Sequence, residues 1–239
     1  MKASRGKKAA VVAGALLSTA AVVGATVASS DAASSAADGS TSTHAELTPL
    51  NNSGVTGDAH VTVDGHRLEV DLDARHLLKG MPHAEHIHFG AQARQECPTV
   101  RDDDNADHRL TTAEGQPAYG PVKVSLTTTG DTSAKSTLAV KRYPLARKGQ
   151  IHYNRDGIEV SPAVARAIRN GKAVLVVHGI DYNGNGKYDF SAGRSELDPS
   201  LPAEATDPVT CGVLEVVEDS STATPTPTGS PSLPLPLKQ

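Results

Sequence analysis

The stretch "GMPHAEHIHFG", residues 80–90, contains three closely spaced histidines, His83, His86 and His88. His86 and His88 are separated by one residue, so on a β-strand their side chains point to the same face, and His83 lies where that strand begins. Two neutral imidazoles on one face can bind a single metal ion without bending the backbone. The alternative is a polar, solvated face, and the His-x-His pattern by itself does not separate the two interpretations.

A fourth histidine favours the metal-binding interpretation. His178 ends the apolar run "VLVV", where an imidazole is costly to bury unless it has a hydrogen-bond partner or a metal. His178 is therefore a further candidate ligand beside His86 and His88, whereas His83 points to a different side and is expected to be bonded to the backbone or to support a ligand. Nitrogen ligands of this kind favour copper or zinc over calcium.

Two loops carry oxygen ligands at the spacing of calcium-binding loops. In "DDNADHRLTTAE", residues 103–114, positions 1, 3, 5, 9 and 12 of an EF-hand-type pattern are Asp103, Asn105, Asp107, Thr111 and Glu114. In "DYNGNGKYD", residues 181–189, positions 1, 3, 5 and 9 are Asp181, Asn183, Asn185 and Asp189. The first pattern has His108 instead of glycine at its sixth position, and the second has Ala192 instead of glutamate at its twelfth. Calcium is expected in the first loop and less so in the second, against the alternative that both are ordinary turns.

The elements that position these side chains mostly show the two-residue period of β-strands. "AHVTVDGHRLEVDLDA", residues 59–74, alternates around Asp64-Gly65, a pair that favours a tight hairpin turn. "VKVSLTTTGD" repeats the alternation, and "AVLVVHG" and "CGVLEVV" are denser apolar runs suited to interior strands. In "SPAVARAIRNG", Ser161 as N-cap, Pro162 at the first helical position and Gly171 past the end predict a short helix. The prediction is an all-β fold, an antiparallel β-sandwich or flattened barrel with long loops and one short helix.

The remaining histidines are assigned no role. His60, His66 and His76 lie on or beside the predicted hairpin strands, where exposed imidazoles are ordinary. His44 lies in a segment expected to be a flexible lead-in.

The ends of the chain differ in composition from this domain. Four basic residues precede an apolar run that ends in small residues, which predicts a signal peptide over residues 1–33; by length the run could also be an uncleaved anchor. Residues 34–47 are expected as the flexible lead-in, residues 48–218 as one domain, and the Ser/Thr/Pro-rich residues 219–239 as a disordered tail. Without residues 1–33 the chain holds 19 basic and 26 acidic residues, a formal charge of about −7 with no basic patch. Nucleic acid is therefore not an expected partner.

Cys97 and Cys211 are the two cysteines of the chain. In an exported chain an even pair so far apart most simply forms one disulfide, which for a loop of this length stabilises the fold by about 4–5 kcal/mol. The alternative, two thiolates of a metal site, needs partners at a short spacing that the sequence lacks.

Taken together, these segments resemble a known family. "HAEHIHFG", Cys97, "TGD" at 129–131, "GKAVLVVHG" and "CGVLEVV" occur in the order and approximate spacing of the copper/zinc superoxide dismutases. The same fragments are similar to the chordin-type (CHRD) domain found in secreted bacterial proteins. The resemblance covers residues 48 to 217 and implies a Greek-key β-barrel with a disulfide between the two cysteines. It also implies three copper ligands, which are His86, His88 and His178. Because His178 is then on a strand beside the one that carries the other two, we expect nitrogens of the three imidazoles to converge on one point.

Other positions depart from the dismutase pattern. The bridging histidine of the family falls near Ala118 and Tyr119 here, and Thr128 stands where the last zinc histidine belongs, although Asp131 is retained. Pro208 replaces the arginine that steers superoxide. A zinc site is therefore not expected, and dismutation lacks its bridging ligand and its anion guide. His108 could supply a fourth copper ligand if its loop folds back over the strand.

Two functions of different class remain. The first is a secreted, non-enzymatic dismutase-like domain of the CHRD type that binds copper at the histidine cluster and calcium in its loops. The alternative is a copper-only superoxide dismutase. The first is preferred because the residues missing from the dismutase pattern, the bridging histidine and the steering arginine, are those that dismutation uses rather than those that the fold uses. Metal ions are the expected partners, no membrane contact is expected beyond the signal peptide, and the absence of a nucleophile elbow or a phosphate-binding glycine loop argues against a hydrolase.

Overall fold

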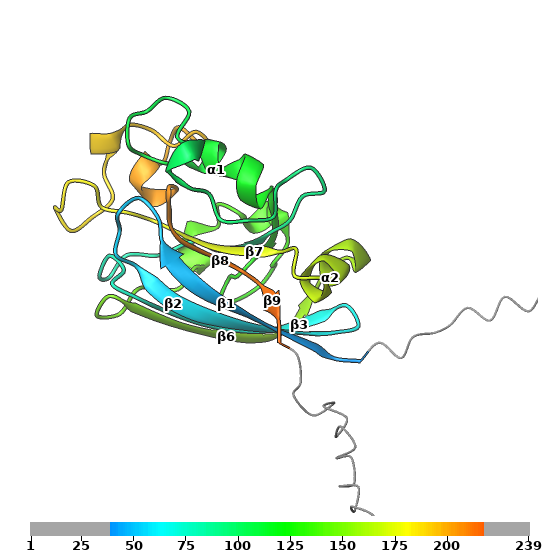
Figure 1. Cartoon of the computed structure of the whole chain (residues 1–239). Coiled ribbons are helices and arrows are strands. Elements are labelled where there is room, and N and C mark those ends of the chain that lie inside the picture. The colour runs from blue at the N-terminus through cyan, green and yellow to red at the C-terminus, as the bar shows by residue number, and fades with distance from the viewer. Residues whose placement is uncertain (1–38, 218–239) are drawn as a thin grey trace, which may run out of the picture. The chain divides into compact units, whose positions relative to one another are not determined.

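The computed structural model describes residues 39–217, so the predicted signal peptide and the Ser/Thr/Pro-rich tail lie outside the described residues. This part of the chain is mostly β-strand with two α-helices (Figure 1). The strands are β1 (Thr41–Pro49), β2 (Thr56–Asp64), β3 (Arg67–Arg75), β4 (Glu85–His88), β5 (Val122–Ser125), β6 (Gln150–Glu159), β7 (Val174–His178), β8 (Pro208–Val213) and β9 (Glu215–Val216). The helices are α1 (Thr112–Tyr119) and α2 (Pro162–Arg169). Within residues 39–217 no helix is long and apolar enough to cross a membrane.

The strands form one curled sheet in the order β5-β4-β7-β8-β1-β2-β3-β6, with β9 paired to β1. All of its ladders among the described residues are antiparallel. Consecutive strands β3 and β4 lie in different halves of the sheet, as do β6 and β7, so the chain crosses between the halves in the manner of a Greek key. In Figure 1 the half made of β1, β2, β3 and β6 lies below β7 and β8. This half-barrel confirms the predicted all-β antiparallel class.

The main apolar core fills the space between the two halves. Inward side chains such as Val61 and Leu72 from one half and Ile87 and Leu175 from the other belong to one buried cluster. A second cluster lies on the opposite face of β7 and β8, where Val174, Val176 and Cys211 pack against Tyr119 of α1. That face is therefore covered by loops and α1, and these loops form the cover of the site described below.

The sheet begins earlier than the sequence predicted. β1 starts at Thr41 and buries Thr43, Ala45 and Leu47, so the second half of the expected lead-in 34–47 is a strand, and the domain starts before residue 48. The inward positions include a threonine and an alanine, which give a weak alternation of hydropathy along the chain. His44 therefore lies on a strand and not in a flexible segment.

Local signals located the hairpin and one of the two helices. β2 and β3 form the predicted hairpin, with Gly65 and His66 as its loop residues, one position later than expected, and Gly65 has the positive φ of 54° that the turn requires. α2 begins after Ser161, whose side chain accepts a hydrogen bond from the backbone of Val164, as predicted. α2 is the predicted short helix, and α1 is a second helix that the sequence did not predict.

Candidate metal centre

The short strand β4 positions two of the three predicted copper ligands. His86 and His88 lie opposite Val176 and Val174 of β7, on the loop-covered face of the sheet, whereas Glu85 and Ile87 point into the barrel. His178 is the last residue of β7. The exposed fractions of the three imidazole residues are only 1–3%, so solvent is almost completely excluded from them.

The three imidazoles converge. One nitrogen from each of His86, His88 and His178 lies within 4.8 Å of the other two. The ring centroids of His86 and His178 are 5.1 Å apart, those of His86 and His88 5.7 Å, and those of His88 and His178 6.1 Å. The arrangement that the sequence predicted is therefore the one that the fold builds.

Each imidazole is held from outside by a different loop. His88 Nδ1 lies 2.8 Å from the carbonyl of Gly120, directly after α1. His86 Nε2 lies 3.2 Å from the carbonyl of Thr137, in the loop after β5. His178 Nδ1 lies 2.6 Å from the carbonyl of Thr206, in the loop before β8. Because a carbonyl oxygen only accepts, each of these nitrogens carries the hydrogen and donates it. His86 Nε2 also lies 2.8 Å from the hydroxyl of Tyr143, but that hydroxyl donates its own hydrogen to the carbonyl of Ser136 and so accepts from His86.

The opposite nitrogens are therefore lone pairs without a hydrogen-bond partner. His86 Nδ1, His88 Nε2 and His178 Nε2 are buried, and none has a donor among residues 39–217. Buried polar atoms in folded proteins nearly always have a partner, so three convergent orphans require an explanation. Imidazoles that bind metals typically donate their other ring N–H to a carbonyl, which is the arrangement seen at all three positions.

Burial also keeps the imidazoles in the form that binds metal. Loss of hydration lowers the pKa of His88 to about 3 and that of His178 to about 4, with the neighbouring histidines adding to the effect. For His86 the pKa is lowered well below its ordinary value, mainly by burial and then by His178 and His88. All three rings are therefore neutral at pH 7, as metal ligation requires.

A small cavity lies against the three imidazoles. Its volume is about 30 Å³, room for about one water-sized group. Its apolar walls come from β5 and the covering loops and include Val122, Leu138, Val140, Leu197 and Leu201. No lysine or arginine is among the residues that line it.

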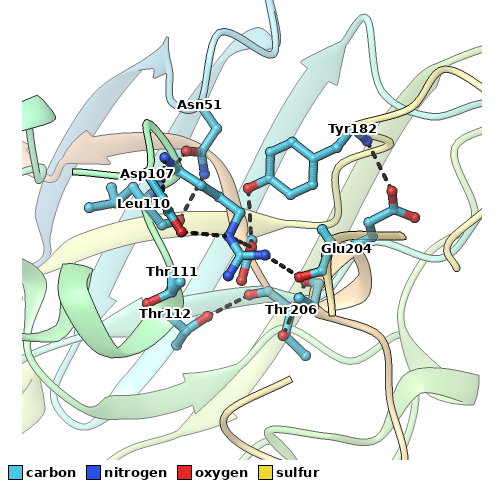
Figure 2. A network of polar contacts seen from close by, with 12 residues as sticks. Asn51, Asp107, Leu110, Thr111, Thr112, Tyr182, Glu204 and Thr206 are labelled. Carbon is cyan, nitrogen blue, oxygen red and sulfur yellow. Dashed lines mark hydrogen bonds and ion pairs between the residues drawn. The ribbon is translucent and has the colours of Figure 1, made fainter. Parts of the chain in front are cut away.

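A polar network fixes the loop that orients His178 (Figure 2). The carbonyl of Thr206 accepts both from His178 and from the hydroxyl of Thr112, the first residue of α1, at 2.5 Å. Asn51 donates to the carbonyls of Leu110 and Pro208, both at 2.9 Å. The loop before α1 and the loop before β8 are thus tied to each other beside the histidine cluster.

Asp207 lies next to Thr206 in this network. Tyr182 donates its hydroxyl to the carboxyl group of Asp207 at 3.1 Å, and Arg109 Nε is 3.7 Å away. Burial raises the pKa of Asp207 to about 7, although Arg109 and the hydrogen bond from Tyr182 act in the opposite direction. The sequence carried no local signal for these three residues, because they come from three separate loops.

The other two histidines considered with the cluster, His83 and His108, contribute no nitrogen to it. His83 is buried, with Nδ1 2.8 Å from the carbonyl of His178 and Nε2 3.3 Å from that of Leu78, so it is bonded to the backbone as expected. His108 is exposed, its backbone amide donates to Asp103, and it is not part of the histidine group. The structure does not bring His108 to the cluster as a fourth ligand, because its loop remains on the surface.

The first predicted calcium loop uses its side chains mainly to shape the backbone. Asp103 accepts from the amides of Asp107 and His108, and Asn105 also accepts from Asp107. Thr111 and Glu114 form a capping box at the start of α1, each accepting from the other's backbone amide. These two side chains therefore hold the helix terminus, and calcium binding by this loop stays a prediction.

The second predicted calcium loop is closed in a similar way. Asp181 accepts from the amides of Gly184, Asn185 and Gly186. The side chains of Asn183 and Asn185 donate to the carboxylate of Asp189. Buried Glu204 accepts from the amides of Tyr182 and Asp189, which anchors the loop to the domain. Calcium binding here also stays a prediction.

The disulfide is formed as predicted. Cys97 and Cys211 are bonded, with their Cα atoms 5.7 Å apart and a sequence separation of 114. The bond ties the loop before α1 to β8. Cys211 pairs with Val176 of β7, which in turn pairs with His86 of β4. The disulfide therefore holds the covering loop close to the histidine cluster.

Sequence reasoning missed the groups that orient the imidazoles. Gly120, Thr137 and Thr206 act through backbone carbonyls, which every residue type has, so residue identity gives no signal. Tyr143, whose hydroxyl lies 2.8 Å from His86 Nε2, has a side chain that could have been noticed, but its 57-residue separation from His86 hides the contact. Comparison with models of known protein families and with curated protein sequences finds no match to this chain.

Proposed function

We propose that residues 39–217 form a copper-binding, dismutase-like domain of the CHRD type in a secreted protein, with a binding rather than a catalytic role. The observation that carries the proposal is the set of three buried lone pairs, on His86 Nδ1, His88 Nε2 and His178 Nε2, that converge without a donor. One cation at their centre would satisfy all three.

The chemistry of the ligand set supports copper. Three neutral imidazole nitrogens suit first-row transition metals, and among the divalent ions Cu²⁺ binds such sites most strongly. Calcium is disfavoured because it prefers oxygen ligands. Copper bound here would supply a redox-active cation in a site from which solvent is largely excluded.

The cavity supports binding over dismutation. It has room for only about one water-sized group and no basic side chain lines it, so an anionic substrate meets no positive charge at the site. The family's bridging histidine is replaced near Ala118 and Tyr119, which end α1, and Pro208 stands where the resemblance places the steering arginine. The copper-only dismutase remains the second candidate, because three protein ligands leave an open position on the ion.

Secretion is supported by two independent features. The basic and then apolar N-terminal sequence has the pattern of a signal peptide. The disulfide between Cys97 and Cys211 is typical of an oxidising compartment.

The test is a copper titration of the chain purified without added metal. We expect one Cu²⁺ bound with nitrogen hyperfine splitting in its electron paramagnetic resonance spectrum, and loss of that signal in the His86→Ala/His178→Ala double variant. The matched control is His66→Ala/His76→Ala, which removes two imidazoles away from the cluster and should keep the signal. His88→Ala serves as a second variant if the first does not fold, as judged by circular dichroism. An unchanged signal in the cluster variants would refute the proposal.

A superoxide decay assay on the same samples separates the two candidate functions. The binding role predicts decay little faster than that of the metal-free chain. Robust turnover that requires copper and is lost in the cluster variant would instead establish the dismutase.

A further inference from the structure

The outer face of the β1-β2-β3-β6 half carries an ordered array of polar side chains. Along these strands the inward residues are buried, so the alternate positions point away from the core. The register places them in two rows that run across neighbouring strands. The first row is Glu215, His44, His60, Asp71 and Asn154, and the second is Glu46, Asp58, Asp73 and His152.

Two imidazoles of this array face each other. His44 on β1 and His60 on β2 are directly paired across the strands, with ring centroids 4.6 Å apart. One nitrogen from each ring and one carboxylate oxygen of Asp58 all lie within 4.8 Å of one another. Neither imidazole has a hydrogen bond to any residue in 39–217, so both rings are free to accept a ligand.

The charge around this pair favours a cation. Glu46, Asp58 and Asp73 lie directly opposite one another on three successive strands, an arrangement in which like charges repel. Within 39–217, Arg75 lies 3.9 Å from Asp58 and His152 lies 2.9 Å from Asp73. A divalent cation beside Asp58 would offset repulsion among the three carboxylates that these two contacts offset only in part.

A neighbouring group shows the opposite situation. Asp71, Asp73 and His152 are also close enough to share an ion, but their polar atoms already have partners. His152 Nδ1 lies 2.9 Å from Asp73, and Asn154 donates to Asp71 at 2.9 Å. An ion in that group would have to displace these contacts, whereas an ion between His44 and His60 displaces no hydrogen bond of either imidazole and competes only with the 3.9 Å contact of Arg75 to Asp58.

We propose that His44, His60 and Asp58 form a second, surface metal site that binds a borderline divalent cation of the Zn²⁺ class. Two imidazole nitrogens and one carboxylate oxygen on adjacent strands make a three-ligand set that solvent completes, and such sets bind zinc. The strands hold the ligands in place, because the inward neighbours of His60, Ala59 and Val61, are completely buried. This site is separate from the buried histidine cluster and does not depend on the copper proposal.

The experiment is a calorimetric titration of the metal-free chain with Zn²⁺ alone. We expect His44→Ala/His60→Ala to lose one zinc equivalent relative to the parent, and Asp58→Asn to weaken that equivalent by about tenfold or more, since even the loss of an outer-shell partner costs this much at metal sites. The matched control His66→Ala/His76→Ala should keep it. All substituted residues are exposed or half-buried, so folding is expected to persist and is checked by melting temperature.

The outcomes separate this site from the buried one. Copper bound at the buried cluster should give the same electron paramagnetic resonance spectrum in the His44→Ala/His60→Ala variant as in the parent. If the number of zinc equivalents and their affinity are the same in parent and variant, the surface site does not exist, whatever the copper result. If zinc is lost equally in the His66→Ala/His76→Ala control, binding is unspecific and the proposal also fails.

Discussion

At the scale of single residues, the buried carboxyl group of Glu85 is expected to lower the stability of the fold. It precedes His86 on β4 but points to the inner face, where both of its carboxyl oxygens are buried without a partner among residues 39–217. Burial raises the pKa of Glu85 well above its ordinary value. A raised pKa in the folded state means that the carboxyl favours folding most at pH values below its unfolded pKa, and that this contribution is lost as the pH rises through the folded value.

We predict that Glu85→Leu stabilises the protein at pH 7 by about 1–3 kcal/mol, the cost of burying a polar group without a hydrogen bond. In the parent, stability should decrease as the pH rises above the unfolded pKa of Glu85. In the variant this decrease should be smaller. Urea unfolding at several pH values measures both effects. The control is Glu69→Leu on the exposed face of β3, for which a change within about 0.5 kcal/mol is expected. Destabilisation by Glu85→Leu would show that the carboxyl has a required partner.

At the scale of elements, α1 shows that one short sequence pattern can have two meanings. Thr111 and Glu114 fit positions 9 and 12 of a calcium loop, and they also fit the Thr-x-x-Glu capping box. The structure uses them as the capping box, which starts the helix whose far end presents the Gly120 carbonyl to His88. The interior Pro117 and Gly115 conceal the helix from propensity-based reasoning.

Calcium binding by the loop at residues 103–114 is therefore tested by the difference between the melting temperatures in calcium and in chelator. We predict weak binding, with a dissociation constant of roughly 10⁻⁴–10⁻³ M, and a higher melting temperature in calcium than in chelator. Asp103→Ala should abolish that difference. It should also lower the melting temperature in chelator, because Asp103 accepts hydrogen bonds from two backbone amides that shape the loop. Equal melting temperatures of the parent in calcium and in chelator would leave the loop as an acidic turn.

At the scale of the whole molecule, three loops converge on the histidine cluster. The loop that contains α1, the loop after β5 and the loop before β8 each provide one carbonyl, from Gly120, Thr137 and Thr206. The disulfide links the first of these loops to β8 across 114 residues. The geometry of the cluster therefore depends on the assembled domain and not on one segment.

We predict that Cys97→Ala/Cys211→Ala lowers the free energy of unfolding by about 5 kcal/mol, the loop-closure value for so long a loop. Copper affinity should fall as well, because the loop that orients His88 becomes less constrained. Urea unfolding and copper titration of the same sample measure the two effects. The parent treated with reductant is the control and should behave like the variant; a variant as stable as the parent would show that packing alone holds the loop.

The sequence by itself determined the features that depend on neighbouring residues. Alternation predicted the β2–β3 hairpin and the interior strands, and the Ser161 and Pro162 pattern predicted α2, because backbone preference and side-chain period act over a few positions. The spacing of His86 and His88 placed both on one face for the same reason. The association of these two histidines with His178 came from the family resemblance. The disulfide was predicted from the resemblance and from the presence of a single pair of cysteines in an exported chain.

The tertiary structure alone decided what each of these groups does. Which nitrogen of each imidazole carries the hydrogen depends on carbonyls that are 28 to 51 residues away, and a backbone carbonyl leaves no trace in residue identity. The pairing of His44 with His60 depends on strand register, which side chains set only after the sheet has formed. A strand whose inward side chains are small, such as β1, likewise becomes recognisable only through the partners that bury it.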